Sequence, residues 1–139
     1  MPKDAGYSGT PLAKKLGYKE GFRCYSTEPE PEYRSRFDEL PAVSFLSKPK
    51  APLDVVHLFV TNAKGLETQL RRYRPMIEPA GMIWVSWPKK ASKVPTDITE
   101  NTIRELAFPL GLVDVKVCAV DSIWSGLKLV IRVALRKTV

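Results

Sequence analysis

Two nearly continuous apolar runs, residues 54–60 and 81–87, constrain the fold of this chain more than any other feature. Runs of this length without polar alternation are typical of strands covered on both faces, which occur mostly in parallel sheets. Parallel neighbours need a crossover connection, and the stretch after each run is long enough to supply a helix. The chain is therefore expected to alternate strands and helices around one sheet.

Helical periodicity fills both of these stretches. In the first, Leu66, Leu70 and Tyr73 fall on one face and form a single apolar stripe. The second carries Ile103 and Ala107 at the same kind of spacing and ends before a glycine. Candidate N-caps are Thr61 or Asn62 for the first helix and Asp97 or Thr99 for the second.

The remaining elements are predicted to be shorter. In the N-terminal half they are, in order, a helix at 10–17, a strand at 21–26, a helix at 33–40 and a strand at 42–47. Strands at 113–120 and 127–134 are separated by so short a linker that they should pair antiparallel. Residues 1–139 are thus expected to form a single three-layer α/β domain, with residues 1–9 as a flexible N-terminal arm. Its mostly parallel sheet should have about six strands and end in a C-terminal antiparallel hairpin.

The net charge is +7, from 22 Lys and Arg against 15 Asp and Glu. A basic balance suits nucleic acid or an anionic ligand, but no block is strongly basic, which favours a solvated surface. No run approaches the ~20 apolar residues of a membrane span, and the N-terminus has no signal-peptide core, so a cytoplasmic protein without membrane contact is expected. Cys24 and Cys118 should be buried free thiols, and with one histidine they predict no metal site.

Three passages resemble the later motifs of class I methyltransferases. Residues 54–58 are similar to the central "D-x-V" strand of that family, and residues 76–85 to its "L-x-P-G-G-x-L-x-V" helix-turn-strand. Residues 111–117, with Trp124 and 127–131, are similar to its closing pair of strands. The resemblance implies a Rossmann-like sheet whose chemistry is supplied by a bound adenosyl cofactor.

A second resemblance spans nearly the whole chain. The stretches GYSGTPLAKKLG (6–17), SWPKK (86–90) and VDSIWSGLKLVIR (120–132) are similar to signatures of a bacterial family of small domains of unknown function. It implies a bacterial origin and a compact α/β domain. It implies no activity and supplies no catalytic residues.

The first half of the chain departs from the methyltransferase pattern. Those enzymes place a glycine-rich turn after the first strand, where backbone N–H groups can face the cofactor. Here the equivalent stretch, 26–33, has no glycine, two prolines and three glutamates. The acidic residue expected after the second strand is replaced by Ser47 and Lys48. No cofactor is therefore predicted.

Ligands of open α/β sheets bind outside the carboxyl ends of the strands. The predicted rim carries the ligand-binding candidates Ser26, Thr61, Asn62, Ser86, Trp87, Lys89 and Lys90. An aromatic face at Trp87 beside two lysines suits an anionic, flat molecule such as a nucleotide. The alternative is that Trp87 packs at the sheet edge while the lysines are solvated.

Secondary candidates lie at the two ends of the chain. Asp121 and Trp124 form either a recognition corner or a turn in which Asp121 binds local backbone and Trp124 caps the core. Gly9 and Thr10 either hold a phosphate at a helix start or form an ordinary capped entry. His57 lies in mid-strand, which favours a core histidine over a general base.

Three functions remain open from the sequence. The first is a non-catalytic methyltransferase-like module for binding or interaction, since no reactive constellation stands out. The second is a divergent enzyme acting on a nucleotide-like or anionic small molecule at the Trp87–Lys90 rim. The third is weak nucleic-acid binding through two basic segments, which are Arg71, Arg72 and Arg74, and Lys89, Lys90 and Lys93.

Overall fold

The structure is a computed structural model that describes residues 10–136. The predicted arm, with Gly9, lies outside the described residues. The α-helices are α1 (Leu12–Leu16), α2 (Glu30–Arg34), α3 (Ala63–Tyr73) and α4 (Glu100–Ala107). The strands are β1 (Arg23–Ser26), β2 (Ser44–Phe45), β3 (Leu53–Phe59), β4 (Ile77–Pro88), β5 (Leu112–Ala119) and β6 (Trp124–Ile131). Short 3-10 turns are η1 (Arg74–Met76), η2 (Lys90–Ser92), η3 (Phe108–Leu110) and η4 (Val133–Leu135).

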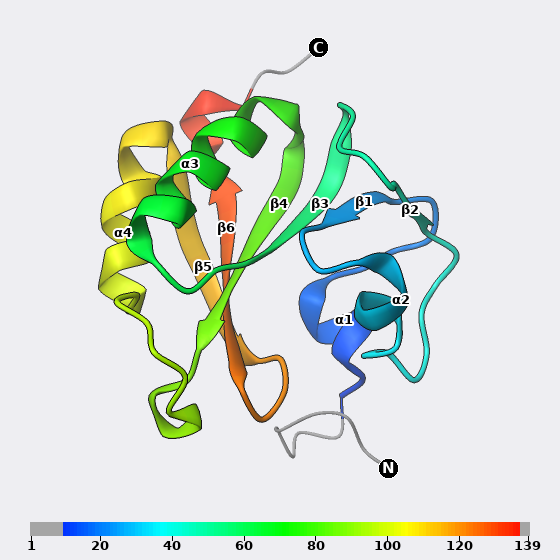
Figure 1. Cartoon of the computed structure of the whole chain (residues 1–139). Coiled ribbons are helices and arrows are strands. Elements are labelled where there is room, and N and C mark those ends of the chain that lie inside the picture. Colours follow the sequence, from blue (N-terminus) through cyan, green and yellow to red (C-terminus); the bar gives the residue numbers. More distant parts are fainter. Residues whose placement is uncertain (1–9, 137–139) are drawn as a thin grey trace.

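The six strands form one sheet in the order β2-β1-β3-β4-β6-β5 (Figure 1). The first four are parallel neighbours and follow the 2-1-3-4 order of doubly wound sheets. Strand β6 runs antiparallel to both β4 and β5 and lies between them. The predicted fold class, a mostly parallel six-stranded α/β sheet with a C-terminal antiparallel hairpin, is confirmed.

Helices cover both faces of the sheet, and each face has its own core. Helices α3 and α4 pack on one face, where Leu66, Leu70 and Ile103 meet apolar side chains from β3, β4 and β6. Helices α1 and α2 pack on the other, where Leu16 and Tyr33 meet the inward residues of that face. Figure 1 shows the two helix pairs on opposite sides of the strands.

Local capping sets where the long helices begin. The Asn62 side chain accepts the N–H of Gly65 and caps α3, and Thr99 caps α4 in a capping box with Thr102. Both agree with candidates predicted from the sequence. At α1 the predicted cap is wrong, because Pro11 rather than Thr10 is the N-cap residue and no side chain caps the helix. Pro11 supplies a pre-set φ and leaves no N–H to satisfy there.

Several boundaries differ from the predictions: α2 ends at Arg34 rather than near 40, and β6 is Trp124–Ile131 rather than 127–134. Two further differences follow from backbone chemistry. Helix α2 begins at Glu30 rather than near 33, since proline is tolerated in a first helical turn. Strand β4 begins at Ile77, so Gly81 lies inside it beside an irregularity in the β3–β4 pairing. A Cβ at Gly81 would lie 3.1 Å from the Leu53 carbonyl oxygen, which explains why glycine fits this close approach.

The cysteine prediction holds in part. Both cysteines are free, and Cys24 is buried, but Cys118 is only half-buried because it lies on the edge strand β5. Within residues 10–136, no helix is long and apolar enough to cross a membrane. In the same range no group of three His, Cys, Asp or Glu side chains gathers closely enough to hold a metal ion.

Candidate functional site

The strand order reverses direction between β1 and β3, so the crevice where doubly wound sheets bind ligands lies beyond the ends of these strands. We call this place the switch-point crevice. Thr27 joins its two walls: its N–H donates to the His57 carbonyl at 3.0 Å, and its Oγ1 accepts the Phe59 N–H at 2.9 Å. The Thr27 N–H, the His57 carbonyl and the Phe59 N–H are therefore already paired at the strand ends.

Tyr33 of α2 reaches under this crevice and is fully buried. Its hydroxyl lies 2.7 Å from the Tyr18 hydroxyl and 2.7 Å from His57 Nδ1. The other ring nitrogen, His57 Nε2, lies 2.6 Å from Ser86 Oγ. The four side chains form an unbroken hydrogen-bonded chain from α1–β1 to β4, and each of them is buried.

Burial decides the protonation of this chain. It lowers the pKa of His57 to about 3, with a smaller contribution from the positive charge of Arg36. Burial also raises the pKa of Tyr33 far above its ordinary value. At neutral pH the imidazole and the phenol are both uncharged, and neither has solvent access for proton exchange. The prediction that His57 is a core histidine is confirmed.

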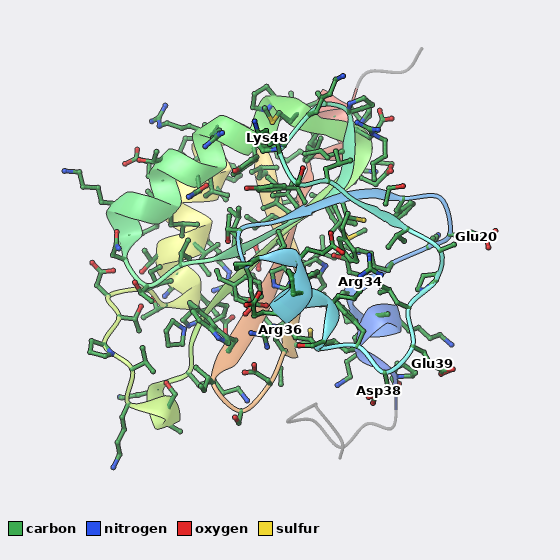
Figure 2. The ribbon with its side chains drawn as sticks, turned by 45° about the vertical axis from the view of Figure 1, so that its right-hand side comes forward. Glu20, Arg34, Arg36, Asp38, Glu39 and Lys48 are labelled. Carbon is green, nitrogen blue, oxygen red and sulfur yellow. The ribbon has the colours of Figure 1, made fainter. Side chains whose placement is uncertain are left out.

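Arg36 lies just after α2, near the switch-point crevice (Figure 2). Its guanidinium donates to both carboxylate oxygens of Glu28, at 2.6 and 2.8 Å, and also to Asp121. Its charged end lies 5.0 Å from the centre of the Phe59 ring, which in turn packs edge-on against Trp124. The arginine, two carboxylates and two rings thus lie close together above β1 and β3, and a hollow of about 380 Å³ lined by Glu28, Arg36 and Asp121 lies beside them.

Asp121 and Trp124 form a turn, as one of the two sequence readings predicts. Asp121 Oδ1 accepts the N–H groups of Ile123 and Trp124, both at 2.7 Å. Burial alone would raise the pKa of Asp121, but the Trp124 N–H and the Arg36 guanidinium outweigh it and hold that pKa below its usual value. The bond to Arg36 is the part of this corner that the sequence did not indicate.

The predicted rim residues do not come together as one site. Ser26 accepts the Glu28 N–H, Asn62 caps α3, and Ser86 is fully buried against His57. Ser86 is therefore not a rim residue, because its side chain points to the α1–α2 face of the sheet. The Thr61 side chain is exposed, and its carbonyl accepts the Thr96 hydroxyl.

Trp87 and Lys90 do lie together, in a groove between the end of β4, the loop after it and the start of α4. This β4–α4 groove has a volume of about 800 Å³ and is also lined by Lys93, Val94 and Arg104. Trp87 is only 8% exposed, so it forms part of the floor and offers little free aromatic face. Lys89 does not line the groove; its N–H binds the Ile123 carbonyl.

Sequence reasoning missed Tyr18, Tyr33 and Arg36. Tyr33 and Arg36 fall in a stretch with a weak helical pattern, and their partners are distant in sequence. The sequence carried one signal for these two residues. Tyr33 and Arg36 lie at the end of, and just after, a connector (residues 26–33) that contains no glycine. Lys93, in contrast, was named only for its charge, and its place in the groove comes from the fold.

No family model matches the chain, and no curated protein matches it in sequence. Solved structures match in shape. An O-methyltransferase from neocarzinostatin biosynthesis, in complex with S-adenosylmethionine, has a TM-score of 0.62 at 11% identity, over 86% of this chain and 50% of that one. A SAM-dependent methyltransferase from Aquifex aeolicus has a TM-score of 0.58 at 15% identity, over 84% and 85% of the two chains.

Magnesium protoporphyrin IX methyltransferase from Synechocystis PCC 6803, with bound SAM, has a TM-score of 0.57 at 9% identity, over 86% and 74% of the two chains. The fold of this chain is therefore that of class I SAM-dependent methyltransferases. At such identities the likeness concerns the fold, and function has to be argued from the site.

Proposed function

We propose that this chain is a non-catalytic, methyltransferase-like module that acts by binding, with its switch-point crevice closed by its own residues. The observation that carries the proposal is the plug formed by Thr27, Tyr33 and Arg36. Each of the three bonds a partner on the opposite wall or beneath the crevice. An adenosyl group needs that space, so the residues present do not fit this cofactor.

The connector after β1 supports the same view. Glycine allows a backbone to approach a cofactor closely, and residues 26–33 contain none. Helix α2 has five residues and carries Pro31, which has no N–H, in its first turn, so its start has few N–H groups to offer an anion. The nearby carboxylates of Glu28 and Asp121 are already bound to Arg36 and are not free for a ribose.

The chain's acid–base groups also favour a binding role. His57 is the one histidine, and both of its nitrogens are occupied inside the core. Burial raises the pKa of Cys24 to about 12, which keeps that thiol protonated and unreactive. A divergent enzyme acting on an anionic molecule remains the alternative function, and it would have to work in the β4–α4 groove without either group.

Isothermal titration of the full chain with S-adenosylmethionine tests this proposal. We expect no saturable heat, while the Aquifex aeolicus methyltransferase measured in parallel serves as the positive control. Backbone amide NMR during the same titration should leave residues 26–36 and 121 unshifted. Micromolar affinity together with shifts at those residues would overturn the closed-crevice proposal.

A further inference from the structure

The β4–α4 groove lies on the α3–α4 face of the sheet, whereas the closed crevice lies on the α1–α2 face. It opens at the carboxyl end of β4, an edge of the sheet where ligands of α/β proteins bind. Its volume of about 800 Å³ falls within the range of small-molecule pockets. This groove therefore remains available although the crevice is filled.

The charge of the groove is positive and largely uncompensated. Lys90, Lys93 and Arg104 line it, and Glu100 is the acidic residue among the described lining side chains. Glu100 lies 2.8 Å from Arg104 in an ion pair, and Asp114 also binds Arg104. Lys90 and Lys93 make no ion pair with any residue between 10 and 136. Two exposed lysines without an ion pair among residues 10–136 thus line one hollow.

The loop that carries these lysines is fixed by hydrogen bonds at both ends. Ser92 donates to the Lys89 carbonyl at 2.6 Å and accepts the Val94 N–H at 3.2 Å. Further along, Thr96 donates to the Thr61 carbonyl at 2.7 Å, and Asp97 accepts the Ala63 N–H at 2.7 Å. These bonds fix the backbone from which the lysine side chains extend, so the loop itself need not be ordered when a ligand binds.

Beneath the charges the groove is apolar. Trp87 and Ile98 are 8% and 3% exposed and form its floor, and Pro88 and Val94 form its wall. Cations above an apolar floor favour a ligand with one anionic group and a compact apolar body. Phosphate suits two ammonium groups because its oxygens can accept from both at once.

We propose that the β4–α4 groove binds a small organic phosphate of about mononucleotide size, with its phosphate on Lys90 and Lys93 and its ring against Pro88 and Val94. This inference deepens the proposed binding role and rests on it. The site differs from a methyltransferase cofactor site in its place on the sheet and in the charge of its ligand.

The test uses backbone amide NMR on the full chain with AMP, adenosine and inorganic phosphate as probes. Each is titrated to about 10 mM, where even a millimolar site approaches saturation. We expect AMP to give saturable shifts confined to residues 87–104, adenosine to give none, and phosphate to bind more weakly than AMP. Absence of saturation by AMP, equal binding of adenosine, or shifts elsewhere on the chain would overturn the proposal.

The matched variants are Lys90→Ala/Lys93→Ala and, as control, Lys48→Ala/Lys64→Ala, which removes two exposed lysines outside the groove. The groove variant should lose at least about tenfold in affinity for AMP, and the control should keep it. Equal loss in both variants would show a diffuse charge effect and contradict the site. Binding of S-adenosylmethionine at residues 26–36 would instead contradict the closed crevice and leave this result unaffected.

Discussion

His57 occupies the centre of the α1–α2 core with a hydroxyl on each ring nitrogen. Two neutral hydrogen bonds and a ring stacked 4.4 Å from Phe59 stabilise the uncharged imidazole. Protonation would place a charge where no described carboxylate contacts the ring. Burial of this histidine should therefore make the folded protein less stable at acid pH.

The pH dependence of unfolding tests this link. Because the pKa of His57 is about 3 in the folded state and ordinarily about 6.5, the unfolded state binds the extra proton between these values. The unfolding free energy should therefore fall as pH drops from about 6.5 to 3, by up to roughly 5 kcal/mol from this residue. The measurement is urea unfolding across that range, compared with His57→Gln, which should show a shallower dependence.

The single histidine gives an independent check. Its ring resonances in NMR should stay those of the neutral form until the protein unfolds in acid. Titration of the folded protein near pH 6.5 would contradict the buried, hydrogen-bonded state. At this scale the sequence predicted the environment of His57 from its mid-strand position, but not its partners, because Tyr33 and Ser86 lie 24 and 29 positions away along the chain.

The segment from Thr27 to Phe37 is attached to the rest of the molecule by the buried rings of Tyr33 and Phe37 and by the ion pair of Arg36 with Asp121. The side chain is 15% exposed and bridges Glu28 with Asp121, 85 positions further along the chain. Arg34 of the same segment forms an ion pair with Glu30, lies 4.8 Å from the centre of the Phe45 ring and is half-exposed. The two arginines thus provide a matched comparison (Figure 2).

Replacing Arg36 should loosen this segment. Arg36→Ala leaves two partly buried carboxylates without a cation, so we expect a loss of about 2–3 kcal/mol in unfolding free energy. Arg34→Ala should cost under about 1 kcal/mol, as exposed ion pairs usually do. Chemical denaturation measures both values, and hydrogen exchange should accelerate over residues 27–37 in the first variant alone. Similar costs for the two variants would show that Arg36 does not hold the segment.

How well an element could be predicted depended on its length. The apolar pattern located α3, α4 and strands β3, β4 and β6 because each has buried apolar residues at a regular spacing. Edge strand β5 was located by its run of β-branched residues, although Val115 and Val117 are exposed. Strand β2 has two residues and α2 has five, so neither contains a full period. The plug depends on helix α2. The sequence therefore indicated a closed crevice only through the absence of a glycine-rich turn after the first strand, and not through the residues that close it.

The two basic segments that the sequence suggested for nucleic-acid binding lie at opposite edges of the sheet. Helix α3 begins after β3 and ends before β4, so Arg71, Arg72 and Arg74 lie at the amino edge of the sheet, whereas Lys89 to Lys93 follow its carboxyl edge (Figure 1). An 11-residue helix spans about 16 Å between them. Arg71 pairs with Glu67, and Arg74 binds the Leu110 carbonyl.

Nucleic-acid binding should accordingly be weak. We expect duplex DNA and single-stranded RNA to show no saturable anisotropy change at physiological salt, because neither basic segment is long enough to neutralise several phosphates at once. Titration at low and moderate salt checks this expectation. A tight complex with a steep salt dependence would contradict this expectation. It would indicate that the net charge of +7 serves to bind a polyanion.

The position of β6 has a consequence for the order in which the chain can fold as it leaves the ribosome. Its residues are synthesised after both of the strands they pair with, β4 on one side and β5 on the other. Until β6 has been synthesised, one edge of β4 is unpaired and β5 has no strand to pair with in this sheet. Completion of the sheet must wait for the final strand, and a nascent chain stopped before Trp124 would be a target for chaperones and proteases.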